Sequence, residues 1–245
     1  MSNEINNSEL EALKIFKDIK TVPDFFNHLD IILNDVYSNK NLIKPATAMC
    51  RDDSVTGIIH ELENRGYMAP FNMETLSGVP VFGNTGYGAF YHHIPDDGIG
   101  LIIYAPHVGL SSEGNYGDLE RPGKKEMGKS CGANHTIINN WKENNYSNFE
   151  NDPELSQVSK ILFNKKEEIL NAKEPILKIM EEEYKLGLEK FTNDIINLKK
   201  REHHDYPILL VSGIHIDTRE EIDNMFELRD IRLFKKEDYK IINLK

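Results

Sequence analysis

Two cysteines and one histidine are the residues of this sequence best suited to chemistry. Cys50 and Cys131 are the only cysteines in 245 residues, and His107 lies between them in the chain. Each of the three follows an apolar run or opens a turn. Two thiolates and one imidazole bind zinc with a fourth tetrahedral position left for water, as in catalytic zinc sites. The sequence therefore predicts a zinc site of Cys50, His107 and Cys131; the alternative is two buried thiols and a core histidine.

An aspartate follows the first cysteine closely. Asp52 lies two residues after Cys50. If the chain is still extended there, residues i and i+2 point to the same side, so the carboxylate of Asp52 would lie near the metal while Arg51 points away. A second interpretation is that Asp52 or Asp53 caps a helix expected to begin near Ser54.

The order Cys, His, Cys, with an aspartate two residues after the first cysteine and a glycine after the second, resembles the β-class carbonic anhydrases. In that class the histidine and the second cysteine lie only a few residues apart, whereas His107 and Cys131 are separated by 24 positions. This wider interval is similar to the limiting-CO2-inducible protein B (LCIB) family, the θ-type carbonic anhydrases, over roughly residues 40–220. The resemblance implies a β-carbonic-anhydrase-like fold and the reversible hydration of carbon dioxide to bicarbonate by zinc-bound hydroxide.

The resemblance also implies that Asp52 accepts a hydrogen bond from this hydroxide, and that an arginine two residues further along orients Asp52. That position is Ser54 here. Arg51 is the first choice for the pairing, and the alternatives are an arginine from elsewhere or no pairing at all. Because position 54 is not an arginine, a second function stays open. The protein would then be a catalytically weak or inactive, zinc-stabilised family member that acts as a regulatory or binding protein in inorganic-carbon handling.

Three further histidines are candidates for proton transfer, because imidazole titrates near neutral pH. They are His92, His93 and His135. For His92 and His93 the alternative is a surface turn, where paired histidines are commoner than in proton transfer.

The elements that must position these residues follow from the hydrophobic pattern. Apolar runs predict strands, and the first two of them end just before Cys50 and His107. A helix is expected to open at Cys131, and a long helical tract to break near Pro175. Alternating strands and helices predict an α/β fold with a mainly parallel central sheet flanked by helices. The expected strands are 46–49, 99–105, 207–214 and 231–234, and the other expected helices are 54–65 and 153–202.

Three connecting segments carry weaker patterns. Residues 80–93, rich in Gly, Tyr and Phe, predict a hairpin or a pocket wall. Residues between His107 and Cys131 have no periodicity and predict a loop that covers the site. Asp217 and Thr218, followed by Glu221, predict the cap of a short helix.

Two amphipathic helices are expected at the start of the chain. One covers residues 8–20 with a capping box of Ser8 and Glu11, and the other opens at Thr21 with Pro23 in its first turn. Their apolar stripes suit either the core or a partner subunit, and because the resembled fold is usually dimeric we expect a homodimer. We expect one α/β zinc domain of residues 1–245, in which residues 1–40 form a helical extension packed on the core or on a partner.

Charge and composition restrict the partners. The chain has 29 basic and 40 acidic residues, a net charge of -11, so a nucleic-acid backbone would meet a repulsive field. No stretch of about 18 apolar residues occurs, and no signal-peptide pattern opens the chain, so no membrane partner is expected. Two cysteines make no disulfide framework and suit a reducing compartment. The sequence thus predicts a cytoplasmic protein whose small-molecule partners, by the resemblance, are carbon dioxide and bicarbonate.

Overall fold

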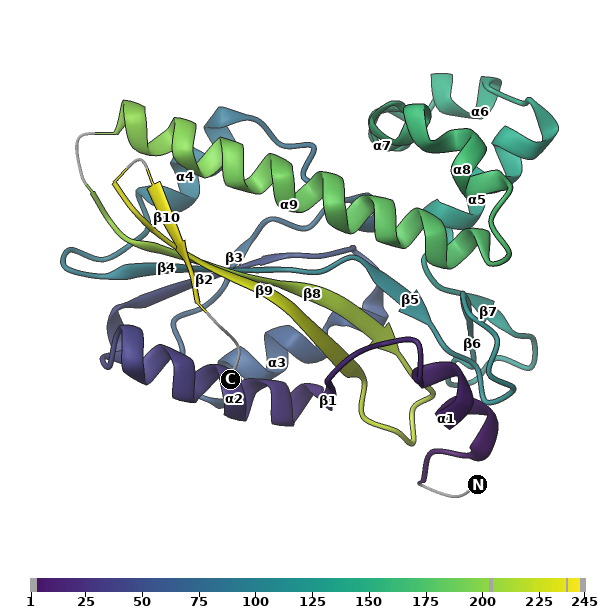
Figure 1. Ribbon diagram of the computed structural model, residues 1–245, viewed down its shortest axis with the longest axis horizontal. Coiled ribbons are helices and arrows are strands. Elements are labelled where there is room, and N and C mark those ends of the chain that lie inside the picture. Colours follow the sequence, from purple (N-terminus) through teal and green to yellow (C-terminus); the bar gives the residue numbers. More distant parts are fainter. Residues whose placement is uncertain (1–3, 203–204, 237, 243–245) are drawn as a thin grey trace.

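The structure is a computed structural model, and it describes residues 4–202, 205–236 and 238–242. A twisted sheet lies at its centre, with helices on both faces (Figure 1). The predicted domain of residues 1–245 includes residues outside these ranges. The strands of the sheet are β1 (Ile19–Thr21), β2 (Ile43–Ala48), β3 (Phe71–Asn72), β4 (Ile99–Tyr104), β5 (His107–Gly109), β8 (Ile208–Asp217), β9 (Met225–Lys235) and β10 (Asp238–Ile241).

The strands follow the order β1-β9-β8-β4-β2-β3, with β10 beside β9 and β5 beside β8. The pairs among β2, β3, β4, β5 and β8 are all parallel. Every residue of β4 and β8 is buried, which is why both strands are nearly continuous apolar runs in the sequence. The connection from β8 to β9 spans only residues 218–224, so β9 returns antiparallel, and β1 and β10 pair antiparallel with it. The predicted mainly parallel sheet is confirmed, with an antiparallel edge.

Helices cover the two faces of the sheet separately (Figure 1). One face packs on α2 (Val22–Val36) and α3 (Gly57–Asn64), and the other on α4 (Asn84–Tyr91) and the long α9 (Pro175–Arg201). At one end of α9 lies a group of shorter helices, α5 (Gly132–Glu143), α6 (Ser147–Glu150), α7 (Pro153–Leu162) and α8 (Lys166–Leu170). Among the described residues, no helix is both long and apolar enough to cross a membrane.

The second predicted helix is confirmed as α2. The hydroxyl of Thr21 accepts a hydrogen bond from the backbone N–H of Asp24, and Pro23 lies in the first turn. Its side chains Phe25, Phe26 and Leu29 are fully buried against the sheet. The apolar stripe of α2 therefore serves the core of the chain itself.

Several predicted boundaries are wrong for local reasons. The first helix, α1, is only Asn7–Leu13: Asn6 and Glu9 form the capping box in place of Ser8 and Glu11, and residues 19 and 20 belong to β1. Residues 80–93 contain helix α4 rather than a hairpin. After Cys50 the chain forms a 3-10 turn, Asp53–Val55, and α3 begins at Gly57 without a side-chain cap.

Two segments near the expected site also differ from the prediction. No helix follows Asp217, because β8 continues to that residue through its pairing with β5 and β9. The expected covering loop contains β5 and a small second sheet of β6 (Asp118–Leu119) and β7 (Gly128–Lys129). The break near Pro175 is confirmed, since the helical tract is divided into α7, α8 and α9.

Candidate metal centre

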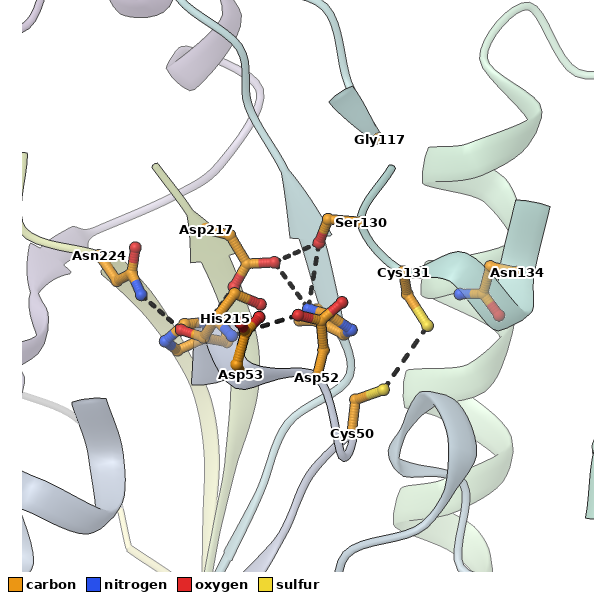
Figure 2. A network of polar contacts seen from close by, with 12 residues as sticks. Cys50, Asp52, Asp53, Gly117, Ser130, Cys131, Asn134, His215, Asp217 and Asn224 are labelled. Carbon is orange, nitrogen blue, oxygen red and sulfur yellow. Dashed lines mark hydrogen bonds and ion pairs between the residues drawn. The ribbon is translucent and has the colours of Figure 1, made fainter. Parts of the chain in front are cut away.

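The three predicted ligands meet at the carboxyl ends of the parallel strands. Cys50 lies just beyond β2, His107 opens β5, and Cys131 is the N-cap residue of α5. All three are buried, at 4%, 1% and 1% exposure. The two Sγ atoms are 3.7 Å apart, and one ligand atom from each residue lies within 4.8 Å of the others (Figure 2). In open α/β sheets this edge is where sites form.

The geometry of the cluster fits one tetrahedral metal ion. Two thiolates about 2.3 Å from a single zinc ion lie about 3.8 Å apart, close to the observed spacing of Cys50 and Cys131. Nε2 of His107 is buried and has no hydrogen-bond partner among the described residues, so its lone pair is available to a cation. The cluster found in the described part of the chain includes no fourth protein ligand, which leaves one coordination position for a small molecule.

A buried carboxylate fixes the orientation of His107. Asp217, at the end of β8, places Oδ2 2.7 Å from Nδ1 of His107. Burial opposes ionisation, but His107 and His215 outweigh it and hold the pKa of Asp217 far below its usual range. An ionised carboxylate only accepts hydrogen bonds, so Nδ1 of His107 donates and Nε2 is left as the metal-binding atom.

Two further side chains hold Asp217 in place. His215 Nδ1 lies 2.9 Å from Oδ1 of Asp217, and the hydroxyl of Ser130 donates to Oδ2 (Figure 2). The parallel register of β5 and β8 places His107 opposite His215, two residues before Asp217. Since residues i and i+2 of a strand share a face, both histidines and the aspartate point to the same side of the sheet.

The two thiols differ in their readiness to ionise. The neighbouring Cys131 thiol lowers the pKa of Cys50 to about 5 against the effect of burial. The neighbouring Cys50, together with burial, raises the pKa of Cys131 well above the usual value. At neutral pH one thiolate is therefore present, and a divalent cation replaces the second proton when it binds.

Asp52 lies beside the cluster and is paired with Arg121. The two oxygens of Asp52 accept from Nη2 of Arg121 at 2.8 and 2.9 Å, and Oδ1 also accepts from the backbone N–H of Ser54 at 3.2 Å. Arg121 also donates to the exposed carboxylate of Asp53. Burial works against ionisation, but Arg121 outweighs it and holds the pKa of Asp52 below its usual value. Asp52 is thus both a cap of the 3-10 turn and one half of an Asp–Arg pair.

The pairing of Asp52 with Arg51 is wrong. Arg51 is more than half exposed and donates instead to Glu154 of α7, at 2.7 Å. The chain turns after Cys50, so the carboxylate of Asp52 faces the segment between β6 and β7, which carries Arg121. The same Glu154 accepts from the backbone N–H of Leu76, so Arg51 helps to hold the neighbouring turn.

The histidines considered for proton transfer have their contacts elsewhere. His92 faces Glu202 at 3.6 Å, and Nδ1 of His93 lies 2.6 Å from the carbonyl oxygen of Ala89. His135 donates to the carbonyl oxygen of Gly117. A cleft of about 610 Å³ opens on the outer side of the Asp52–Arg121 pair, and its lining includes Asp53, Ser54, His60, Arg121 and Asn224.

Comparisons with known proteins agree with this geometry. The sequence model of the family "Limiting CO2-inducible proteins B/C beta carbonic anhydrases" matches residues 19–234. The crystal structure of PtLCIB4, a homologue of LCIB, superposes with a TM-score of 0.86 at 25% identity, covering 95% of this chain and 98% of that one. LCIB itself superposes with a TM-score of 0.70 at 18% identity, covering 97% and 99%. No curated protein sequence matches the chain.

The fold and the site therefore define a protein of the β-carbonic-anhydrase type. The match over most of the chain shows that it belongs to the limiting-CO2-inducible protein B/C family.

Proposed function

We propose that this protein is a zinc-dependent carbonic anhydrase that interconverts carbon dioxide and bicarbonate. The observation that carries the proposal is the cluster of Cys50, His107 and Cys131, with an open position, beside a carboxylate locked by Arg121. Membership of a family named for carbonic anhydrases supports the substrate. Zinc is the metal that best suits two thiolates and one imidazole.

Zinc, when bound, supplies a strong nucleophile from water at neutral pH. The residues around it then have distinct tasks. Asp52 is ionised and accepts hydrogen bonds only, so it orients the attacking water through the proton that this water keeps. Arg121 fixes both oxygens of Asp52 and keeps the carboxylate charged. Asp217 keeps the proton of His107 on Nδ1, so that Nε2 remains a ligand.

The alternative of a catalytically inactive, regulatory family member rested on the missing arginine at position 54. Arg121 makes the contact that this position would supply, with both oxygens of Asp52. This contact supports the enzymatic proposal over the regulatory alternative.

A comparison of two arginines tests the proposed function. Arg121→Ala is expected to lower the rate of carbon dioxide hydration by roughly ten- to a hundredfold, because Asp52 loses its fixed orientation and its charge partner. Arg51→Ala removes an equally charged side chain that contacts Glu154 instead, and should leave the rate within about twofold of the parent. Stopped-flow hydration assays on samples of equal zinc content measure both. A parent-like rate for Arg121→Ala would contradict the role given to the Asp52–Arg121 pair.

We also propose that the protein forms a homodimer. Three large apolar side chains of the N-terminal segment are exposed: Leu10 of α1 at 47%, Ile15 between α1 and β1 at 54%, and Ile31 of α2 at 62%. A partner subunit would cover such side chains. Light scattering at micromolar concentration should give the mass of two chains, and the mass of one chain would count against the proposal.

A further inference from the structure

Glu183 is a buried carboxyl group that the proposed reaction does not use. It lies on α9, has no exposed surface, and is close enough to Cys50 and Cys131 to influence the pKa of the Cys131 thiol. Burial raises the pKa of Glu183 to about 8, so at neutral pH the group is mostly the uncharged acid. Burying a carboxyl group lowers the stability of the fold. Packing alone therefore does not explain why Glu183 lies in the interior.

Two polar side chains from separate elements lie near Glu183. Nδ2 of Asn134, in the first turn of α5, donates to Oε2 of Glu183 at 2.8 Å. Ser77, in a 3-10 turn (Leu76–Gly78), also acts on the carboxyl group and works to lower its pKa. All three side chains are buried, and each has one atom without a well-formed hydrogen bond among the described residues: Ser77 Oγ, Asn134 Oδ1 and Glu183 Oε1. The carboxyl group thus joins α9 to α5 by a hydrogen bond and lies near the turn that carries Ser77.

One of these segments presents Cys131. Cys131 is the N-cap residue of α5, and the backbone N–H of Asn134 works to lower the pKa of its thiol without forming a capping hydrogen bond. The direction of this N–H depends on how the first turn of α5 is held. The side chain of the same residue, Asn134, is held by Glu183. Figure 2 shows Asn134 on the side of Cys131 that faces away from Asp217.

The other segment lies against Cys50. The backbone N–H of Thr75 donates to the carbonyl oxygen of Met49 at 3.1 Å, and Thr75 forms a parallel bridge with Cys50. A Cβ atom on Gly78 would lie 3.3 Å from the backbone nitrogen of Cys50, so the turn and the cysteine are in close contact. Ser77 lies in this turn and close enough to Glu183 to affect its pKa, but its hydroxyl makes no hydrogen bond among the described residues.

We propose that Glu183 is a positioning residue of the metal centre: through its hydrogen bond to Asn134 it fixes the first turn of α5, which presents Cys131, so that the thiols of Cys131 and Cys50 keep a metal-binding spacing. This inference rests on the metal centre of the proposed function. As an uncharged acid, the side chain accepts one hydrogen bond and can donate another without adding negative charge beside two thiolates. A glutamine side chain has the same capacity to accept and to donate.

The test compares the zinc affinity of Glu183→Gln, Glu183→Ala and Asn134→Ala, measured by competition with a chelator. Glu183→Ala and Asn134→Ala should bind zinc roughly ten- to a hundredfold more weakly, which is typical for loss of a group that orients a metal ligand. Glu183→Gln should stay within about twofold of the parent. In the cobalt-substituted proteins, the thiolate-to-cobalt absorption should change in both alanine variants and not in the glutamine variant.

Ile195→Ala is the matched control. Ile195 is fully buried on the same helix, three turns beyond Glu183, so its truncation destabilises α9 without touching the cluster. Its zinc affinity and cobalt spectrum should equal those of the parent. If Glu183→Ala does not fold, the zinc affinities and cobalt spectra of Asn134→Ala and Glu183→Gln are compared with those of the parent.

Three results would overturn the inference: parent-like affinity and spectrum in the alanine variants, a glutamine variant as weak as the alanine variant, or an equal loss in Ile195→Ala. Zinc affinity is measured separately from carbon dioxide hydration, so this inference and the proposed function can fail independently. A parent protein that binds one zinc ion and does not hydrate carbon dioxide contradicts the proposed function alone, whereas a parent that binds no zinc contradicts both.

Discussion

Replacing any one of the three ligands is expected to remove most of the metal. The parent protein should carry about one zinc ion per chain, and Cys50→Ser, His107→Ala and Cys131→Ser should each retain only a small fraction of it. Two remaining protein ligands hold zinc far less tightly than three, because each lost ligand removes a strong bond and leaves the others less well placed. Hydration of carbon dioxide should fall to the uncatalysed rate in all three variants.

Elemental analysis after gel filtration measures the zinc content, and His93→Ala serves as the control. His93 is a histidine outside the cluster whose ring contacts the carbonyl oxygen of Ala89, so its loss should leave the metal in place. Full zinc occupancy in the three ligand variants would show that this cluster is not where the protein binds metal.

Replacing Asp52 should separate metal binding from catalysis. Asp52→Asn keeps the size of the side chain but can present a donor where the carboxylate only accepts, so the attacking water is misoriented while all three ligands remain. Loss of one such charge-assisted interaction typically lowers turnover by on the order of a hundredfold. Zinc content should stay near that of the parent. Asparagine is also a good capping residue, so the cap on Ser54 should survive with a change in stability below about 1 kcal/mol.

Asp53→Asn is the matched control for this variant. Asp53 also contacts Arg121, but its side chain is 82% exposed and it lies one residue further from the cluster. Its replacement should change the hydration rate by less than about twofold. Parent-like turnover of Asp52→Asn with intact metal would remove the catalytic role of Asp52.

The cluster of Cys50, His107 and Cys131 and the central strands were predictable because their signals are local. A buried parallel strand is a continuous apolar run, as in β4 and β8, and a site residue follows where such a run ends. The chain has only two cysteines, and of the four histidines between them His107 is the one that follows the apolar run 99–105, which restricts the possible ligand sets to very few. The same reasoning failed for residues 80–93, where glycine and aromatic residues suggest a hairpin but Tyr87, Phe90 and Tyr91 are buried on one side of a helix.

The supporting residues were not predictable because they depend on distant contacts. Asp217 meets His107 through the register of β5 and β8, 110 positions apart in the chain, and Arg121 meets Asp52 across 69 positions. In the sequence Asp217 has the pattern of a helix cap. Glu183 is the last of three consecutive glutamates, 181–183, and such a run usually lies on a solvent-exposed face of a helix. Only the packing of α9 against α5 places Glu183 in the interior.

The most direct test of the central claim is a titration of zinc into metal-free protein, with carbon dioxide hydration followed by stopped flow at each step. If Cys50, His107 and Cys131 hold a catalytic ion, the rate should rise in proportion to bound zinc and level off at about one ion per chain. A protein that binds one zinc ion per chain and leaves the hydration rate at the uncatalysed value would contradict the account.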